Sequence, residues 1–158
     1  MRHIRLTKGY IAIVDDEDFD RLSQWKWSAK VEKCGAVYAH RPVPGTRRNL
    51  LMHRDILGLT DPLIESDHKN GNGLDNRRMN LRAASHAENA RNRKIPKNNK
   101  TGAKGVTLED GRFRAVIRYD KVKYSLGQFG TLKEAAHAYD QAAMRLHGDF
   151  ARTNVVLS

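Results

Sequence analysis

The pattern of hydrophobic and polar positions is clearest in the C-terminal third of the chain. Residues 112–119 and 121–126 alternate between apolar and polar side chains, and a period of two is typical of β-strands. Asp110-Gly111 precedes the first of these runs and is a hairpin signal. Together with the short β-prone run 104–108, the pattern predicts a small antiparallel sheet of three strands.

The two faces of that sheet differ in chemistry. The apolar face needs a cover, and a helix that starts at Thr131 supplies it. Thr131 and Glu134 form a capping box, apolar residues follow at helical spacing up to Leu146, and Gly148 ends the helix. The other face is left exposed and carries five cations, Arg112, Arg114, Arg118, Lys121 and Lys123.

A basic sheet face has two interpretations. It is either a solvated surface that protects the sheet edges or a surface that enters the major groove of B-DNA, which accommodates a β-ribbon. The composition favours DNA, since the 158 residues include 29 Lys and Arg against 18 Asp and Glu, for a net charge of +11. A basic run from Arg91 through Arg93 to Lys104 predicts a linker, which either follows phosphates or is basic for solubility alone.

The middle of the chain combines short elements around a tight loop. A short amphipathic helix is predicted over 50–59, and a strand over 62–66. An Asn- and Gly-rich loop follows, then a strand over 79–84 and a helix that Ser85 and Glu88 cap. The predicted order is therefore strand, long hairpin loop, strand, helix.

Candidate chemistry lies at the end of the first of these strands. Phosphodiester hydrolysis needs a base that activates water and a cation that stabilises the phosphorane and the departing oxygen. Asp67 and His68 face opposite sides of a strand, so Asp67 is a candidate ligand for a hard cation and His68 a candidate base. Asn89 on the following helix offers a second oxygen, and few protein ligands suit Mg²⁺. A local turn hydrogen bond of an Asp-His pair is the alternative.

The first fifty residues carry the weakest signals. Strands are predicted over 36–41 and 49–53, on either side of a Pro-Gly turn at residues 44–45. A hairpin is predicted around residues 8–9, and a short helix with an acidic first turn within 15–27. The acids of that turn resemble a metal cluster, but negative charge at the positive end of a helix dipole explains them.

The middle segment also resembles a known family. Residues 66–93, SDHKNGNGLDNRRMNLRAASHAENARNR, are similar to the HNH endonuclease motif in its phage and homing-endonuclease branch. The resemblance implies a ββα-metal fold with His68 as the general base. It also implies that Asp67 and Asn89 hold the metal, and that Asn80 ties the hairpin together and helps to orient the base.

Two further histidines have less defined roles in this resemblance. His53 matches an upstream His-Arg pair that contacts phosphate or has a structural role. His86 lies one helical turn before Asn89, where it either touches phosphate or has a capping or surface role. The early segment LTKGYIAIVDDEDFDRLSQWKW also resembles the region that precedes the motif in phage HNH proteins.

The C-terminal segment resembles a second family. The pieces KGV, RFRAVIR, LGQFGTLKEAAHAYDQAA and HGDFARTNV are similar to the Apetala-two/ethylene-responsive-factor DNA-binding domain. The resemblance implies a three-stranded sheet on one helix that reads DNA with the sheet, through Arg112, Arg114, Arg118 and Lys123. Ser125 stands where plant members usually carry a tryptophan, so the target sequence does not carry over.

Together these features predict an α+β chain of two modules. An HNH nuclease domain over 1–95, with its motif core at 62–93, precedes a basic linker over 96–103 and an Apetala-two-like domain over 104–156. The predicted function is a metal-dependent, homing-type endonuclease of double-stranded DNA with one Mg²⁺ or Mn²⁺ per active site. The alternatives are a non-catalytic DNA-binding regulator and an RNA-binding protein, although the sheet lacks the aromatic pairs that favour single-stranded RNA.

Several properties of the whole chain bear on its oligomeric state and its location in the cell. The sequence leaves open whether a monomer nicks one strand or a homodimer on DNA cuts both. The single cysteine, Cys34, excludes an internal disulfide and a multi-cysteine zinc site, and it favours a reducing cytoplasm, of a bacterial or phage-infected cell. We expect no membrane span, because no apolar run approaches about 20 residues. We also expect no secretory signal, because the first residues, MRHIRLTKGY, contain no apolar stretch.

Overall fold

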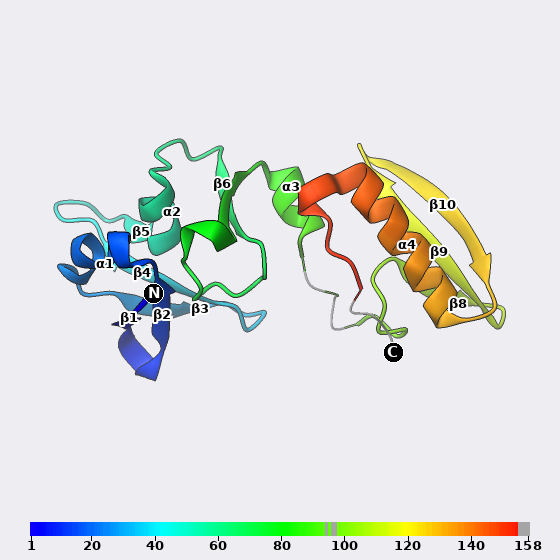
Figure 1. Cartoon of the computed structure of the whole chain (residues 1–158), viewed down its shortest axis with the longest axis horizontal. Helices are drawn as coiled ribbons and strands as arrows, with labels where there is room; N and C mark the ends of the chain where they lie inside the picture. Colours follow the sequence, from blue (N-terminus) through cyan, green and yellow to red (C-terminus); the bar gives the residue numbers. More distant parts are fainter. Residues whose placement is uncertain (94, 96–97, 155–158) are drawn as a thin grey trace. The chain divides into compact units, whose positions relative to one another are not determined.

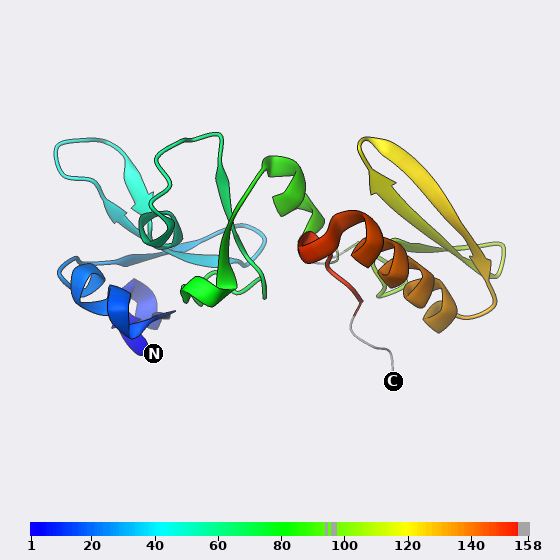
Figure 2. The ribbon, with the colours of Figure 1, turned by 45° about the horizontal axis from the view of Figure 1, so that its top comes forward.

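The chain divides between Asn89 and Ala90 into two units, each with its own core. The computed structural model describes residues 1–93, 95 and 98–154, which Figures 1 and 2 show in two views. Both units combine short antiparallel strands with helices, which confirms the predicted α+β class. No helix within the described ranges is both long and apolar enough to cross a membrane.

The N-terminal unit contains three small antiparallel sheets. The first is the hairpin of β1 (Arg2–Arg5) and β2 (Ile11–Val14). The second is formed by β3 (Ser28–Val31), β4 (Val37–Pro42) and β5 (Asn49–Leu51), and the third by β6 (Glu65–His68) and β7 (Leu81–Ala84). The helices are α1 (Asp16–Ser23) after β2 and α2 (Met52–Leu57) after β5. Helix α3 (His86–Arg91) follows β7, and the division of the chain falls within it.

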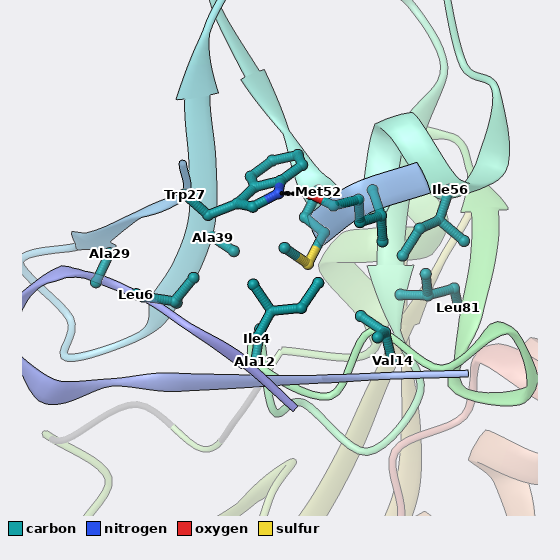
Figure 3. Packing of buried hydrophobic residues seen from close by; sticks show 11 residues of the cluster. Ile4, Leu6, Ala12, Val14, Trp27, Ala29, Ala39, Met52, Ile56 and Leu81 are labelled. Carbon is teal, nitrogen blue, oxygen red and sulfur yellow. Dashed lines mark hydrogen bonds between the residues drawn. The ribbon is translucent and has the colours of Figure 1, made fainter. Parts of the chain in front are cut away.

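A buried indole ring, that of Trp27, belongs to the N-terminal core. The Nε1–H of Trp27 donates a hydrogen bond of 2.8 Å to the carbonyl oxygen of Leu22, so the polar edge of the ring is paired although the ring is buried. Met52 on α2 and Leu81 on β7 belong to the same cluster, whose side chains Figure 3 shows. The core therefore connects the first two sheets to the β6–β7 pair.

Arg78, just before β7, pairs with the acidic start of α1. Its Nε and Nη2 both donate to the buried Asp18 at 2.8 Å, and its backbone N–H donates to Asp15 at 2.7 Å. Glu17 lies 2.7 Å from the same guanidinium. Helix α1 begins at Asp16 with the acidic first turn that the sequence predicts, and Arg78 supplies the positive charge that this acidic cluster needs.

The loop over 69–80, between β6 and β7, is attached to β2 through the main chain. The backbone N–H of Ile13 donates to the oxygen of Leu74, and the N–H of Asn76 donates to the oxygen of Ile13, both at 2.8 Å. The N-terminal hairpin thus holds a loop that lies sixty residues further along the chain.

The C-terminal unit is a three-stranded antiparallel sheet packed on one helix, as predicted. Strand β9 (Arg112–Tyr119) lies between β8 (Val106–Glu109) and β10 (Val122–Phe129). Figure 1 shows helix α4 (Leu132–His147) lying along this sheet. The predicted capping box is present, with Thr131 Oγ1 accepting from the Glu134 N–H and Glu134 accepting from the Thr131 N–H.

Small residues let α4 approach the sheet closely. Four buried alanines line the contact, Ala135, Ala136, Ala142 and Ala143. Gly105, just before β8, has a φ of +73°, and a Cβ built there would lie 2.1 Å from the Tyr139 ring. Only glycine fits this position, because any side chain would meet Tyr139 in a backbone conformation that is itself strained.

The predicted linker over 96–103 is in part folded. Ala103 is fully buried, Thr101 Oγ1 donates to the oxygen of Val106 at 2.9 Å, and Asn99 accepts from the backbone N–H groups of Thr101 and Gly102. These residues belong to the C-terminal unit, which begins at Ala90. Residues 94, 96–97 and 155–156, which the linker and domain predictions include, lie outside the described residues.

Alanine substitutions at two glycines of the C-terminal unit measure the cost of a steric clash apart from that of backbone strain. Gly111→Ala faces open space at a φ of +75° and is expected to cost about 1–2 kcal/mol of backbone strain. Gly105→Ala adds the overlap with Tyr139 and is expected to cost about 2–4 kcal/mol. Urea denaturation of the full chain, followed through the amide signals of β9, measures both costs. Equal costs would show that Gly105 is not tightly packed.

Candidate active site

The candidate residues lie on β6, the following loop, β7 and α3. Strands β6 and β7 pair antiparallel, with Asp67 opposite Arg82 and His68 opposite Leu81. Helix α3 follows at once, and its predicted capping box is present. The backbone N–H of Ser85 donates to Glu88 at 2.7 Å, and the Glu88 N–H donates to Ser85 Oγ at 3.3 Å.

Side-chain amides hold the intervening loop closed. Asn80 is buried, and its Nδ2 donates to the oxygen of Asp75 at 2.7 Å and to Asn70 Oδ1 at 3.1 Å. Asn80 Oδ1 in turn accepts the backbone N–H of Asn70 at 3.0 Å. The Arg77 guanidinium binds Asp75 and holds the pKa of that carboxyl below its usual value. The two ends of the loop are therefore fixed to each other by polar contacts.

His68 is the last residue of β6 and is buried. Its Nε2 lies 3.3 Å from Oδ1 of Asn76, which is also fully buried. Asn76 Nδ2 donates to the Leu74 oxygen at 3.2 Å, so the amide atom that faces His68 is the oxygen Oδ1. An amide oxygen only accepts hydrogen bonds, so His68 must be the donor. The neutral ring is then protonated on Nε2, and its basic lone pair is on Nδ1. Burial lowers the pKa of His68, which favours this neutral form.

His53 on α2 lies against His68 rather than on the surface. The two rings meet edge to face with 4.9 Å between centroids, and Tyr38 lies 5.6 Å from His53 and 5.9 Å from His68. His53 is buried, and its Nδ1 has no hydrogen-bond partner within the part of the chain that the structure describes. The phosphate contact of His53 stays a prediction. Its alternative, a structural role, agrees with this position.

The Asp67 carboxylate is paired with Arg82 on the neighbouring strand. Nε and Nη2 of Arg82 donate to Asp67 Oδ2 at 2.8 and 2.5 Å, and the two side chains are only 6% and 12% exposed. The guanidinium fixes the carboxylate and offsets its charge in a site with little water. Sequence reasoning missed Arg82, since only the register of β6 on β7 brings it opposite Asp67.

Asn89 and His86 both contact Glu65, the first residue of β6. Asn89 Nδ2 donates to Glu65 Oε2 at 2.5 Å, and His86 Nδ1 lies 2.6 Å from Glu65 Oε1. The predicted metal ligands Asp67 and Asn89 thus have different partners, Arg82 and Glu65. Sequence reasoning also missed Glu65, although its position two residues before Asp67 on one strand was a readable signal.

The donors at this site fit a hard cation. Glu65 and Asp67 lie at alternate positions on one face of β6, and Asn89 reaches that face from α3. Carboxylate and amide oxygens are the ligands that Mg²⁺ prefers, and Mg²⁺ commonly takes one or two protein carboxylates and keeps several waters. A small set of oxygen donors is therefore compatible with Mg²⁺ or the similar Mn²⁺.

The sheet of the C-terminal unit presents most of its predicted cations. Arg112, Arg118 and Lys123 are exposed, and Arg118 pairs with Lys123 in register. Lys121 lies in the turn before β10 at a φ of +67°, not on the strand as predicted, because Asp120 and Lys121 form the hairpin turn.

An acidic residue shares this basic face. Glu109 accepts a hydrogen bond of 3.2 Å from half-buried Arg114, and this bond holds the pKa of the Glu109 carboxyl below its usual value. Sequence reasoning did not place an acid among the outward positions. The pair fixes the direction of the Arg114 guanidinium.

Arg91 and Arg93 are not part of an open linker. The Arg91 guanidinium lies 5.3 Å from the centre of the Tyr119 ring and 3.8 Å from Asp120. The backbone oxygens of both arginines accept bonds from Lys104 Nζ, whose burial lowers its pKa to about 8. The Arg91 side chain is thus engaged with Tyr119 and Asp120, and a DNA contact through it requires that these contacts be given up. Arg93 is exposed.

Comparison with known proteins gives two viral relatives. The chain is 27% identical over 154 residues to the uncharacterized HNH endonuclease L560 of Acanthamoeba polyphaga mimivirus, covering 94% of this chain and 77% of that protein. It is 34% identical over 88 residues to protein 3.8 of Escherichia phage T7, covering 54% of this chain and 72% of that protein. The chain belongs to the protein 3.8 family.

This protein 3.8 relative also matches plant transcription factors. It is 46% identical over 71 residues to the ethylene-responsive transcription factor ERF084 of Arabidopsis thaliana, covering 42% of this chain and 27% of that factor. The chain thus spans only about a quarter of this plant factor. No known family profile and no solved structure match the chain.

The buried His53 predicts a loss of stability in acid. Burial first, and His68 next, lower the pKa of His53 to about 3, whereas the unfolded ring has a pKa near 6.5. The unfolded state therefore binds the extra proton between those values, and stability falls as the pH falls through this window. From pH 7.5 to 5 the contribution of His53 is about 2 kcal/mol.

Urea denaturation followed by the fluorescence of the core tryptophan at both pH values measures this loss. His53→Gln removes the titrating group and is expected to lose less stability over the same interval than the parent chain. Identical losses in the two proteins would exclude a buried, neutral His53.

Proposed function

We propose that the chain is a metal-dependent endonuclease of double-stranded DNA, with an HNH-type centre in its N-terminal unit. The observation that carries the proposal is the buried His68 beside Asp67, with a pKa that burial lowers. The order of β6, loop, β7 and α3 is that expected of a ββα-metal centre. Similarity to a mimivirus protein named as an HNH endonuclease supports the same conclusion.

His68 acts as the general base in this mechanism. Asn76 holds the Nε2-protonated tautomer, so Nδ1 accepts the proton of the attacking water. The lowered pKa keeps the ring unprotonated at neutral pH, where it is able to take up that proton. Asn80 holds the loop that carries Asn76, and it thereby orients the base indirectly.

Asp67 and Asn89 are the proposed ligands of Mg²⁺ or Mn²⁺. When bound, the cation neutralises charge at the scissile phosphate and at the departing 3′ oxygen. Arg82 keeps the Asp67 carboxylate in one orientation for this purpose. With one such centre per chain, a monomer nicks one strand, and a double-strand break needs two copies or two events.

The C-terminal unit provides the proposed binding surface for duplex DNA. Its sheet face carries Arg112, Arg118 and Lys123 in exposed positions, and small sheets fit the major groove. Two plant transcription factors, 46% and 50% identical over 71 and 50 residues, support this role. Joining this unit to the nuclease centre raises the local concentration of the centre at DNA.

The same plant relatives favour one alternative, a non-catalytic DNA-binding regulator. In that case the N-terminal unit is a scaffold, and the ion pair between Asp67 and Arg82 only stabilises the fold. The two proposals differ in one outcome, which is whether DNA is cut in the presence of Mg²⁺.

A plasmid nicking assay with Mg²⁺ tests the nuclease. His68→Ala removes the base and is expected to slow nicking about 10²- to 10⁴-fold. Asp67→Ala is expected to abolish metal-dependent cutting because it removes a charged ligand. His3→Ala changes an exposed histidine on β1 and is the matched control, with activity retained. If the parent chain and His68→Ala bind DNA equally and neither cuts, the regulator is correct.

The sheet face has its own test in salt-dependent binding. Arg112→Ala with Arg118→Ala removes two exposed cations from the face and is expected to weaken duplex binding. The slope of log affinity against log salt should also become shallower by about 2. Lys133→Ala with Arg145→Ala removes two exposed cations of α4 instead, and binding should remain near the parent value. Equal effects of the two double variants would remove the sheet assignment.

A further inference from the structure

Glu65 joins β6 to two side chains of α3. Its Oε2 accepts from Asn89 Nδ2 at 2.5 Å, and its Oε1 lies 2.6 Å from His86 Nδ1. One carboxylate therefore contacts the proposed metal ligand Asn89 and a neighbouring histidine one helical turn earlier. Glu65 is half-buried and lies on the same face of β6 as Asp67.

The chemistry of these contacts fixes the direction of the Asn89 amide. An ionised carboxylate only accepts hydrogen bonds, so the branch of the amide that faces Glu65 must be the NH₂ group. The carbonyl oxygen, which alone can ligate a cation, is then the branch directed away from Glu65. Without this constraint the amide can rotate and present its NH₂ group, which does not bind a cation.

We infer that Glu65 is a positioning residue for the divalent cation, acting through the Asn89 amide. This inference rests on the proposed function, because it assigns a role at the same centre. Side chains that hydrogen-bond to metal ligands commonly change metal affinity by about 10- to 100-fold when they are replaced. Glu65 need not touch the cation to have this effect.

Mn²⁺ binding to the full chain in the absence of DNA tests the inference, with free Mn²⁺ measured by electron paramagnetic resonance. Glu65→Gln offers an NH₂ group as well as an oxygen, so it no longer dictates which branch of Asn89 faces it. We expect about 10- to 100-fold weaker Mn²⁺ binding. His86→Ala removes a different contact of the same carboxylate but keeps the Asn89 contact, and it should bind Mn²⁺ like the parent chain.

A double-mutant cycle with Asn89→Asp separates positioning from a structural link between β6 and α3. A carboxylate at residue 89 has two equivalent oxygens and no direction to be fixed. Glu65→Gln should therefore weaken Mn²⁺ binding when residue 89 is Asn and should not weaken it when residue 89 is Asp. An equal loss in both backgrounds, including one caused by misfolding, would overturn the inference.

Failure of the metal site itself has a different signature. If Asp67→Ala and Asn89→Ala both bind Mn²⁺ like the parent chain, the proposed metal centre is wrong, whatever Glu65 does. If those two variants lose Mn²⁺ and Glu65→Gln does not, the centre stands and only the positioning role is overturned.

Discussion

Closure of the loop between β6 and β7 is the constraint on which the candidate site depends. The loop is rich in Asn and Gly and offers few apolar side chains to bury, so polar contacts must hold it. Asn80 ties its two ends together, and the main chain of Ile13 and the side chain of Arg78 attach it to the N-terminal elements. Because Asn76 lies in this loop, the tautomer of His68 depends on the same contacts.

Burial of His68 links stability to the proposed chemistry. A ring shielded from water has a lowered pKa, and the unprotonated form is the one that accepts a proton. The same surroundings leave His53 Nδ1 buried without a described partner, which costs stability. Two histidine rings in edge-to-face contact would repel each other if both were protonated. The pocket is thus suited to neutral rings, and acid opposes both its folding and the action of the base.

Local patterns in the sequence predicted much of this structure, and contacts between distant residues account for the rest. Alternation predicted the sheet of the C-terminal unit, and the spacing of Thr131 and Glu134 predicted the start of its helix. The pairing of Asp67 with Arg82 was not predictable in this way, because it depends on strand register across a long loop. The bond between Glu65 and Asn89 depends on where α3 crosses β6, which no local pattern encodes. The site residues and their catalytic roles stay predictions.

The distribution of ion pairs supports a division of labour between the units. Near the proposed active site, Arg77, Arg78 and Arg82 are each paired with a carboxylate, so their charge is largely used within the fold. On the sheet of the C-terminal unit, Arg112, Arg118 and Lys123 are exposed, and the described residues show no ion pair for them. Phosphate binding depends on cations that can exchange counterions for DNA. Affinity for DNA should therefore come mainly from the sheet, while the N-terminal unit supplies a neutral base and oxygen ligands.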